Sequence, residues 1–266
     1  MATRALLYRR PHEPKTLVIT HGSQFFAIRL RRHRRARRYT LRIHPSDREA
    51  ILTMPPRGTL AEAKDFAQRH GAWIAARLGR LPKAAPFQPG TVIPLRGVPH
   101  RIVHRAGARG TVWTEVRDSG ERILCVAGGV EYADRRVHDF LKREARHDLQ
   151  RSAEAYAGEL GVRVKRLSIR DQSSRWGSCT SAGSLSFSWR LILAPPFVLD
   201  YLAAHEVAHL GHMNHGPRFW GLVERTMPRH EEARTWLRKH GASLHRYGSE
   251  GMLPSARGRS PMRTIE

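Results

Sequence analysis

Hydrophobic and polar residues alternate in short runs over the first part of the chain. β-Branched and aromatic residues recur in runs that end at glycine, proline or clusters of charge, a pattern typical of strands. These runs cover residues 16–20, 24–30, 39–44 and 50–54, and later 91–95, 100–104, 111–116 and 122–126. Between the two sets, residues 59–78 have helical spacing interrupted by Gly71, and Thr59 with Glu62 forms a capping-box pattern. This part predicts a β-rich module with one helix.

The second part of the chain carries longer patterns of helical period. Residues 132–160 predict one long helix that stops at Gly161, because glycine is favoured at helix C-termini. Further helices are expected at 195–212, 219–227 and 231–240, with strands at 162–170 and 185–189. After Ser249 the chain is polar, basic and rich in glycine and proline, which predicts disorder. No internal repeat is evident in the sequence.

These patterns predict an α+β fold with three parts. Residues 1–130 form a β-rich module with one helix and a basic segment, and residues 131–248 form a helical domain with a small sheet. Residues 249–266 form a disordered basic tail.

The composition of the chain indicates where in the cell the protein is expected. Hydrophobic residues make up 40% of the 266 residues, and no run of about 18 apolar residues appears that could cross a membrane. The N-terminus lacks the apolar core of a signal peptide, and Cys125 and Cys179 form no CxxC pair or disulfide framework. We therefore expect a cytoplasmic protein without membrane contact. Nothing in the sequence fixes an oligomeric state.

The charge of the chain is strongly positive. Lysine and arginine number 47 against 23 acidic residues, giving a formal net charge of +24, and nearly all the basic residues are arginine. Such a charge favours polyanionic partners, nucleic acid among them; the alternative is arginines spread over a solvated surface. The densest cluster, residues 31–38, is typical of a solvated turn or hairpin tip, with nucleic-acid contact as the alternative.

One stretch of the expected helix at 195–212 carries candidate chemistry. His205, Glu206 and His209 form an H-E-x-x-H pattern. Residues four apart share a helix face, so the two histidines can present imidazoles to one zinc ion, while Glu206 can act as a general base on water. Burial of these side chains as ordinary core residues is the alternative, but it is costly without a metal or partners.

A catalytic zinc site needs a third protein ligand and leaves a fourth position open. The candidates are His212, His215, Glu224, His230, Glu231 and Glu232. His212 follows His209 too closely to converge on the same metal, whereas His215 precedes Gly216 and Pro217, where the chain can turn back. His215 is therefore favoured, and the pair Glu231 and Glu232 stays open as the alternative. The metzincin pattern requires glycine at the position that His212 occupies, so this chain departs from the metzincin pattern.

Segments around this pattern resemble the YgjP-like and SprT-like zinc metallopeptidases. The resemblance covers about residues 15–245. It rests on H-E-V-A-H-L at 205–210, N-H-G-P-R-F-W at 214–220, I-R at 169–170, S-R-W-G-S-C at 174–179 and S-W-R-L at 188–191. Ser188 stands where the family usually has asparagine.

The resemblance implies a zincin-like metallopeptidase domain that hydrolyses proteins or peptides. In it His205, His209 and His215 hold Zn²⁺ and Glu206 is the catalytic acid and base. Residues 174–179 would form a strand and turn beside the cleft; a tight turn with Trp176 in the core is the alternative.

Three other residues have candidate roles near the site. Arg175 is a candidate contact for the substrate or an oxyanion, with an ordinary salt bridge as the alternative. Asp200 could steady a ligand histidine, although a surface position is commoner. Cys179 lacks an identifiable base, so a structural role is favoured over a nucleophilic one.

Two other function classes remain open. The first is a nucleic-acid-associated protein with a structural or vestigial zinc site, or a peptidase that acts on nucleic-acid-bound proteins. A purely structural zinc site needs neither the carboxylate of Glu206 nor an open fourth position. The second is a zinc amidohydrolase or another non-peptide hydrolase, which uses the same metal chemistry.

Overall fold

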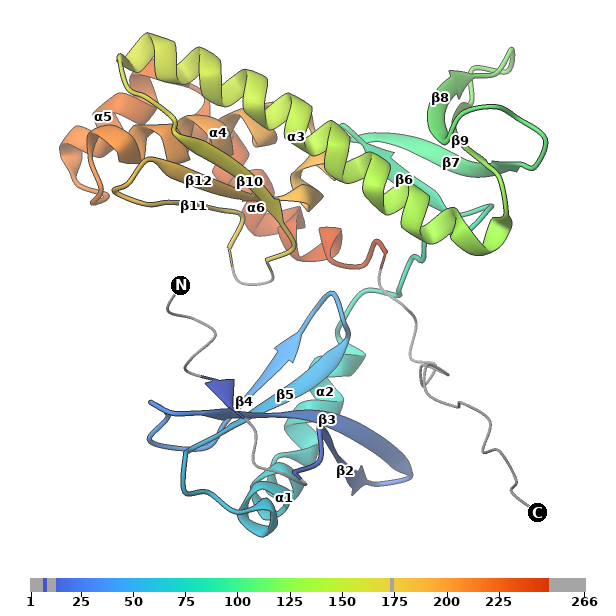
Figure 1. The fold of residues 1–266 in the computed structure, drawn as a ribbon, viewed down its shortest axis with the longest axis vertical. Coiled ribbons are helices and arrows are strands. Elements are labelled where there is room, and N and C mark those ends of the chain that lie inside the picture. Colours follow the sequence, from blue (N-terminus) through green and yellow to red (C-terminus); the bar gives the residue numbers. More distant parts are fainter. Residues whose placement is uncertain (1–6, 9–12, 173–174, 249–266) are drawn as a thin grey trace, which may run out of the picture.

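The structure of the chain is a computed structural model that describes residues 7–8, 13–172 and 175–248 (Figure 1). The tail over 249–266, for which the sequence predicts disorder, lies outside these residues, as does Ser174. Helices and strands are mixed along the described chain, so the predicted α+β class is confirmed. No helix in this part of the chain combines the length and apolar character needed to span a bilayer.

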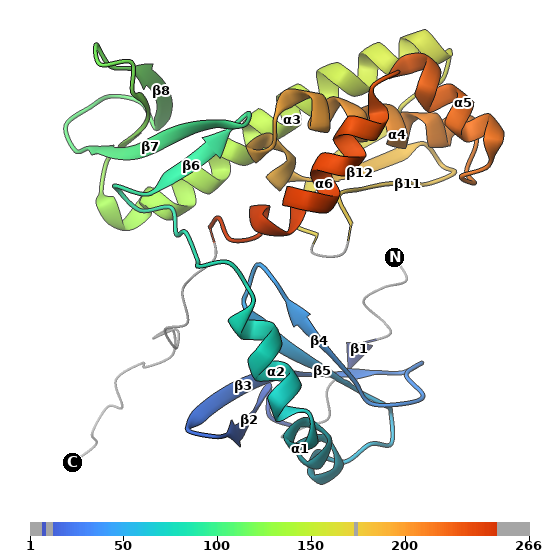
Figure 2. The ribbon, with the colours of Figure 1, turned by 180° about the vertical axis from the view of Figure 1, so that it is seen from behind.

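A five-stranded sheet forms the N-terminal part of the structure. Its strands are β1 (Leu7–Tyr8), β2 (Thr16–His21), β3 (Gln24–His33), β4 (Thr40–His44) and β5 (Glu49–Met54). β5 pairs in parallel with β3 and antiparallel with β4, while β1 and β2 both pair antiparallel with β3. The helices α1 (Leu60–Arg69) and α2 (Gly71–Gly79) lie on one side of this sheet (Figures 1 and 2).

The expectation of one continuous helix over 59–78 is wrong. α1 ends at Arg69 and α2 begins at Gly71, with His70 between them at φ −98° and ψ 12°. A Cβ atom placed on Gly71 would lie 3.0 Å from the Cβ of His21 on β2. The glycine that interrupts the sequence pattern therefore lets α2 start close against the sheet.

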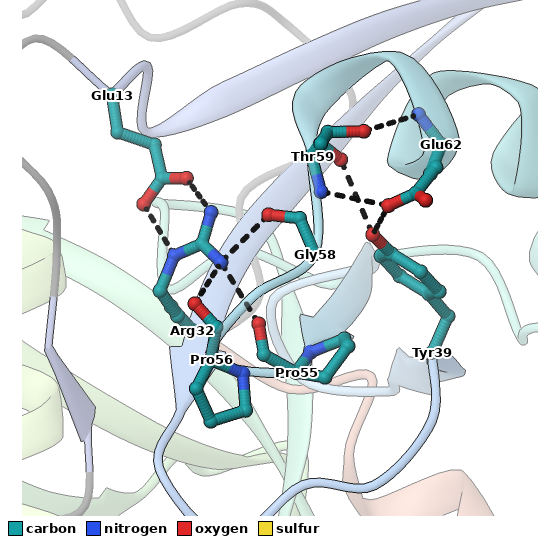
Figure 3. Close-up of polar contacts among 8 residues, drawn as sticks. All are labelled: Glu13, Arg32, Tyr39, Pro55, Pro56, Gly58, Thr59 and Glu62. Atoms are coloured by element: carbon teal, nitrogen blue, oxygen red, sulfur yellow. Dashed lines mark hydrogen bonds and ion pairs between the residues drawn. The ribbon is translucent and has the colours of Figure 1, made fainter.

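A buried arginine connects β3 to the segment between β5 and α1 (Figure 3). Arg32 is 3% exposed and forms an ion pair with Glu13. Its guanidinium also donates to the carbonyl oxygens of Pro55 at 2.8 Å, Pro56 at 3.0 Å and Gly58 at 2.8 Å. Buried charges are stable when paired and hydrogen-bonded, as here, so Arg32 belongs to the interior and not to a solvated tip.

A second sheet follows and repeats the topology of the first. Its strands are β6 (Val92–Leu95), β7 (Val98–Arg105), β8 (Val112–Val116) and β9 (Arg122–Ala127). As in β2–β5, the first two strands form a hairpin, the second pairs in parallel with the fourth, and the third pairs antiparallel with the fourth. In the parallel pair of each sheet, the paired residues are separated by the same number of residues along the chain. Ile28 pairs with Ala50 in the first sheet, and Arg101 pairs with Ile123 in the second.

The helices and a third sheet complete the structure. The helices are α3 (Ala133–Leu160), α4 (Pro196–Gly211), α5 (Pro217–Thr226) and α6 (His230–Leu244), with the 3-10 turns η1 (Val130–Tyr132) and η2 (Trp189–Leu193). β10 (Arg166–Arg170), β11 (Gly177–Cys179) and β12 (Ser184–Ser188) form the sheet in the order β10-β12-β11. Figure 1 shows α3 passing from the second sheet at one end to α4 and the third sheet at the other.

The buried hydrophobic residues form two clusters. The smaller cluster lies between the first sheet and α1 with α2, and includes Ile28, Leu52 and Ile74. The larger cluster joins β6–β9 to α3 and to the helices that follow, so these four strands share a core with the C-terminal part of the chain. A domain is a part of the chain that can fold independently. The domain boundary expected near residue 130 therefore stays a prediction.

Candidate metal centre

Three histidines meet where α4 turns into α5. α4 begins at Pro196, after the N-cap residue Pro195, and most of the helix is buried. His205 and His209 lie four residues apart on it. After α4 ends at Gly211, the chain turns back and brings His215 to within 3.1 Å of His205, measured between their Nε2 atoms. One ligand atom from each histidine lies within 4.8 Å of the others. The structure therefore brings all three predicted ligands together.

Hydrogen bonds orient two of these imidazole rings. The Nδ1 atom of His205 lies 3.3 Å from the hydroxyl of Tyr201, one turn earlier on α4. The Nδ1 atom of His209 lies 3.2 Å from the carbonyl oxygen of His212 and donates to it. A ring whose Nδ1–H is bonded in this way presents the lone pair of Nε2 to a metal.

Aromatic side chains from α5 pack against the three rings. Phe219 is fully buried and stacks on His209 with ring centroids 4.4 Å apart. The ring of Trp220 lies 5.9 Å from that of His215. The segment that supplies His215 is thus anchored by the next turn of helix, which limits the freedom of the third imidazole.

Two of the histidines, His205 and His209, are held in their neutral form. Burial lowers the pKa of His205 to about 3, and the neighbouring His209 and His215 contribute to this shift. Burial also lowers the pKa of His209. Neutral imidazole is the form that binds a metal ion, so these two donors can bind a metal without first releasing protons.

Glu206 lies beside this cluster in a tightly packed position. Its side chain is 5% exposed, and burial raises its pKa to about 7 against the opposing charge of Arg175. Gly177 on β11 faces it: a Cβ atom on this glycine would lie 2.4 Å from the Oε1 atom of Glu206. The strand predicted beside the cleft is therefore present as β11, and its glycine makes room for the carboxyl group.

The other candidate ligands lie outside the cluster. His212 caps the end of α4 and contributes only its carbonyl to His209. Glu231 forms ion pairs with Arg234 and, at 3.5 Å, with His230, and Glu232 pairs with Arg229. Glu224 lies on α5 and is not a member of the described metal-ligand cluster either.

The remaining candidates have local partners. Arg175 is exposed and its Nε donates to Gln172 at 3.1 Å. Asp200 accepts a hydrogen bond from Ser152 on α3 at 2.6 Å, which ties α4 to α3. Cys179 is half-buried, and burial raises the pKa of its thiol to about 11, with the charge of Glu206 adding to the shift.

Tyr201 is the residue at this site that the sequence reasoning did not single out. Its position four residues before His205 places it on the same face of α4, which is the signal that could have identified it. Gly177 belongs to the segment 174–179 that the sequence places beside the site, but its contact with Glu206 depends on the approach of β11 to α4.

Comparison with known proteins identifies a family and, among the solved structures, a metallopeptidase. The model of the YgjP-like family, metallopeptidase domain, matches residues 37–240. No curated protein matches the chain. The crystal structure of the metallopeptidase zymogen of Pyrococcus abyssi abylysin is 21% identical, with a TM-score of 0.32, covering 34% of this chain and 93% of that one. A TM-score this low does not establish a common fold.

Proposed function

Because the chain belongs to the YgjP-like metallopeptidase family, we propose that it is a zinc-dependent peptidase in which Glu206 is the general base. The observation that carries the proposal is the meeting of three imidazoles next to a buried carboxyl group. Its substrate is a protein or peptide. The two cysteines of the chain are free thiols, which supports a location in the reducing cytoplasm.

Zinc is the metal that the donor set favours. Imidazole nitrogen is a preferred zinc ligand, and catalytic zinc sites use three protein ligands with one position left for water or substrate. When bound, zinc supplies the Lewis acidity that activates water and polarises a carbonyl group. His205, His209 and His215 would hold the ion, and Tyr201 would keep His205 in the required orientation.

Glu206 would move the proton. A general base near the reacting water takes its proton as the carbonyl is attacked and returns it to the leaving amine. Glu206 is one residue from His205 on α4, and its burial keeps bulk water away from the carboxyl group. Gly177 fixes where that carboxyl group can lie.

β11 offers a place for an extended peptide. It is the last strand in the order β10-β12-β11, so within the described residues its second edge is unpaired. An extended peptide can add to such an edge through main-chain hydrogen bonds. Because Gly177 of β11 faces Glu206, a peptide bound there would pass the general base.

The alternative of a purely structural zinc site fits the cluster less well. A closed structural site has four protein ligands, and the cluster found among the described residues has three. A structural site also gives no reason to bury Glu206 beside the ligands. A non-peptide hydrolase would use the same residues, so substrate trials must distinguish it from a peptidase.

Replacing Glu206 by glutamine tests the proposal. We expect Glu206→Gln to retain zinc and to lose hydrolysis of a quenched fluorescent peptide or unfolded casein by about a hundredfold or more. Glu224→Gln, on the exposed face of α5, is the matched control and should keep both zinc and activity. Full activity of Glu206→Gln at equal zinc content would refute the general-base role.

A further inference from the structure

The five-stranded sheet has a face that α1 and α2 do not cover. Alternate residues of each strand point to opposite sides of a sheet. Ile28, Leu52 and the residues in register with them pack towards the helices. The residues between them therefore lie on the other side, which Figures 1 and 2 show to be free of both helices.

Arginines line up across this uncovered face. Arg29 on β3 and Arg42 on β4 both pair with Ile51 on β5, so the three residues form one row across the sheet. Arg31 lies two residues further along β3, in the next row on the same side, opposite Thr53. We call Arg29, Arg31 and Arg42 the arginine face.

The three arginines differ in their partners. Arg29 is paired with Glu49 at 2.6 Å. Within the described residues, neither Arg31 nor Arg42 forms an ion pair or a hydrogen bond through its side chain. Burial lowers the pKa of Arg31, and the like charges of Arg29 and Arg42 lower it further. The carboxylates of Glu49 and Asp47 act in the opposite direction but more weakly than the two arginines. An anion placed between the guanidinium groups would relieve the repulsion that is left.

Further arginines follow β3 along the chain, and β3 itself carries an exposed aromatic ring. The turn that follows β3 carries Arg35, Arg37 and Arg38, and all three residues are exposed. Phe25, also on β3 and on the same side as Arg29, is 71% exposed. Guanidinium forks match phosphate oxygens and stack on flat rings, and exposed aromatic rings on an open sheet are platforms for unpaired bases.

We propose that the arginine face, together with the turn at 34–38 and Phe25, binds single-stranded nucleic acid. The guanidinium groups contact the phosphates, and Phe25 offers a ring for base stacking. An acidic protein surface or an anionic membrane would use the same charge and could also contact Phe25, but nucleic acid alone supplies a flat base for stacking next to each phosphate. The proposal is independent of the metal centre, because none of these residues belongs to that site.

The test measures binding of the full-length protein to a fluorescein-labelled oligouridine by fluorescence anisotropy across a range of salt concentrations. We expect Arg31→Gln/Arg42→Gln to weaken binding about tenfold at moderate salt. The slope of log K against log salt should become shallower by about 1.4, or about 0.7 for each phosphate that is no longer neutralised. Removing these charges relieves repulsion, so the variant should fold. Phe25→Ala should weaken binding with little change in the salt slope.

The matched control is Arg69→Gln/Arg77→Gln, which removes the same charge from exposed positions on α1 and α2. It should bind as the unmodified protein does. Equal weakening in both double variants would show that only net charge matters and would overturn the proposal. So would absence of oligonucleotide binding, or binding to vesicles containing phosphatidylserine in preference to the oligonucleotide.

Discussion

At the scale of single residues, the position of Glu206 depends on a glycine in a different element. Gly177 lies so close to the carboxyl group that even one added carbon would overlap it. In the proposed reaction, the carboxylate must be within hydrogen-bond reach of the water it deprotonates. A displacement of about 1 Å in such a group can cost about a hundredfold in rate.

We therefore predict that Gly177→Ala lowers peptidase activity by at least about tenfold, because the new methyl group displaces Glu206. Zinc content, measured by elemental analysis, should stay unchanged because the added methyl group meets Glu206 and not the three histidines. Gly158→Ala on α3 is the control, since nothing lies within 4 Å of a Cβ atom there. Unchanged activity of Gly177→Ala would mean that Glu206 does not need its observed position.

The residues of the site differ in how far the sequence reveals them. His205 and His209 follow from helical spacing alone, because residues four apart share a face. His215 requires the further inference that α4 ends before it, for which Gly216 and Pro217 are a local signal. Gly177 carries no such signal, because its role arises only when β11 packs against α4.

At the scale of elements, the start of α1 was predicted in detail. The hydroxyl of Thr59 accepts a hydrogen bond from the amide of Glu62 at 3.2 Å, and the Glu62 carboxylate accepts from the amide of Thr59 at 2.9 Å (Figure 3). The hydroxyl of Tyr39 also donates to Glu62 at 2.7 Å. This capping box is readable from sequence because its partners are three residues apart.

Removing the cap should loosen α1. We expect Thr59→Ala to destabilise the helix by about 1 kcal/mol, since an N-terminal amide loses its acceptor. The effect should appear as faster amide hydrogen exchange over residues 60–69. Thr235→Ala, at an interior position of α6, should cause no such change in its own helix. Equal exchange in Thr59→Ala and the unmodified protein would contradict the cap's contribution.

Other features of the elements could not be read from the chain. The break between α1 and α2 depends on the approach of Gly71 to His21, which lies on a strand far back in the sequence. The shared topology of β2–β5 and β6–β9 is equally hidden, because strand pairing is set by contacts distant in sequence. Local patterns predicted the strands, but they do not specify which strands become neighbours.

At the scale of the whole molecule, a buried contact joins the N-terminal sheet to the C-terminal part of the chain. Ser46, in the turn between β4 and β5, lies with its hydroxyl 2.8 Å from the Nδ1 atom of His245. His245 in turn stacks on Trp176, with ring centroids 5.1 Å apart. Trp176 precedes Gly177, so this contact reaches the strand that faces Glu206.

This contact should make stability depend on pH. Burial lowers the pKa of His245 to about 4, with the charge of Arg190 adding to the shift. The unfolded chain, with a histidine pKa of about 6.5, takes up a proton that the folded protein does not. The free energy of unfolding should therefore fall as pH decreases from about 6.5 to about 4, by up to about 1.4 kcal/mol per pH unit.

The measurement compares urea unfolding of the unmodified protein and of His245→Asn across this pH range. Asparagine does not titrate, so the difference between the two proteins should change with pH, with the unmodified protein becoming relatively less stable under acid conditions. A difference that is constant between about pH 6.5 and about pH 4 would contradict a buried, neutral His245.

Zinc content measures the central claim most directly, namely that His205, His209 and His215 form one metal site. The comparison is between His215→Ala and His212→Ala, because His212 lies only three residues away and contributes its main-chain carbonyl alone. We predict about one zinc ion per chain in the unmodified protein and in His212→Ala, and a large decrease in His215→Ala. Full zinc content in His215→Ala, or an equal decrease in both variants, would contradict the three-histidine site.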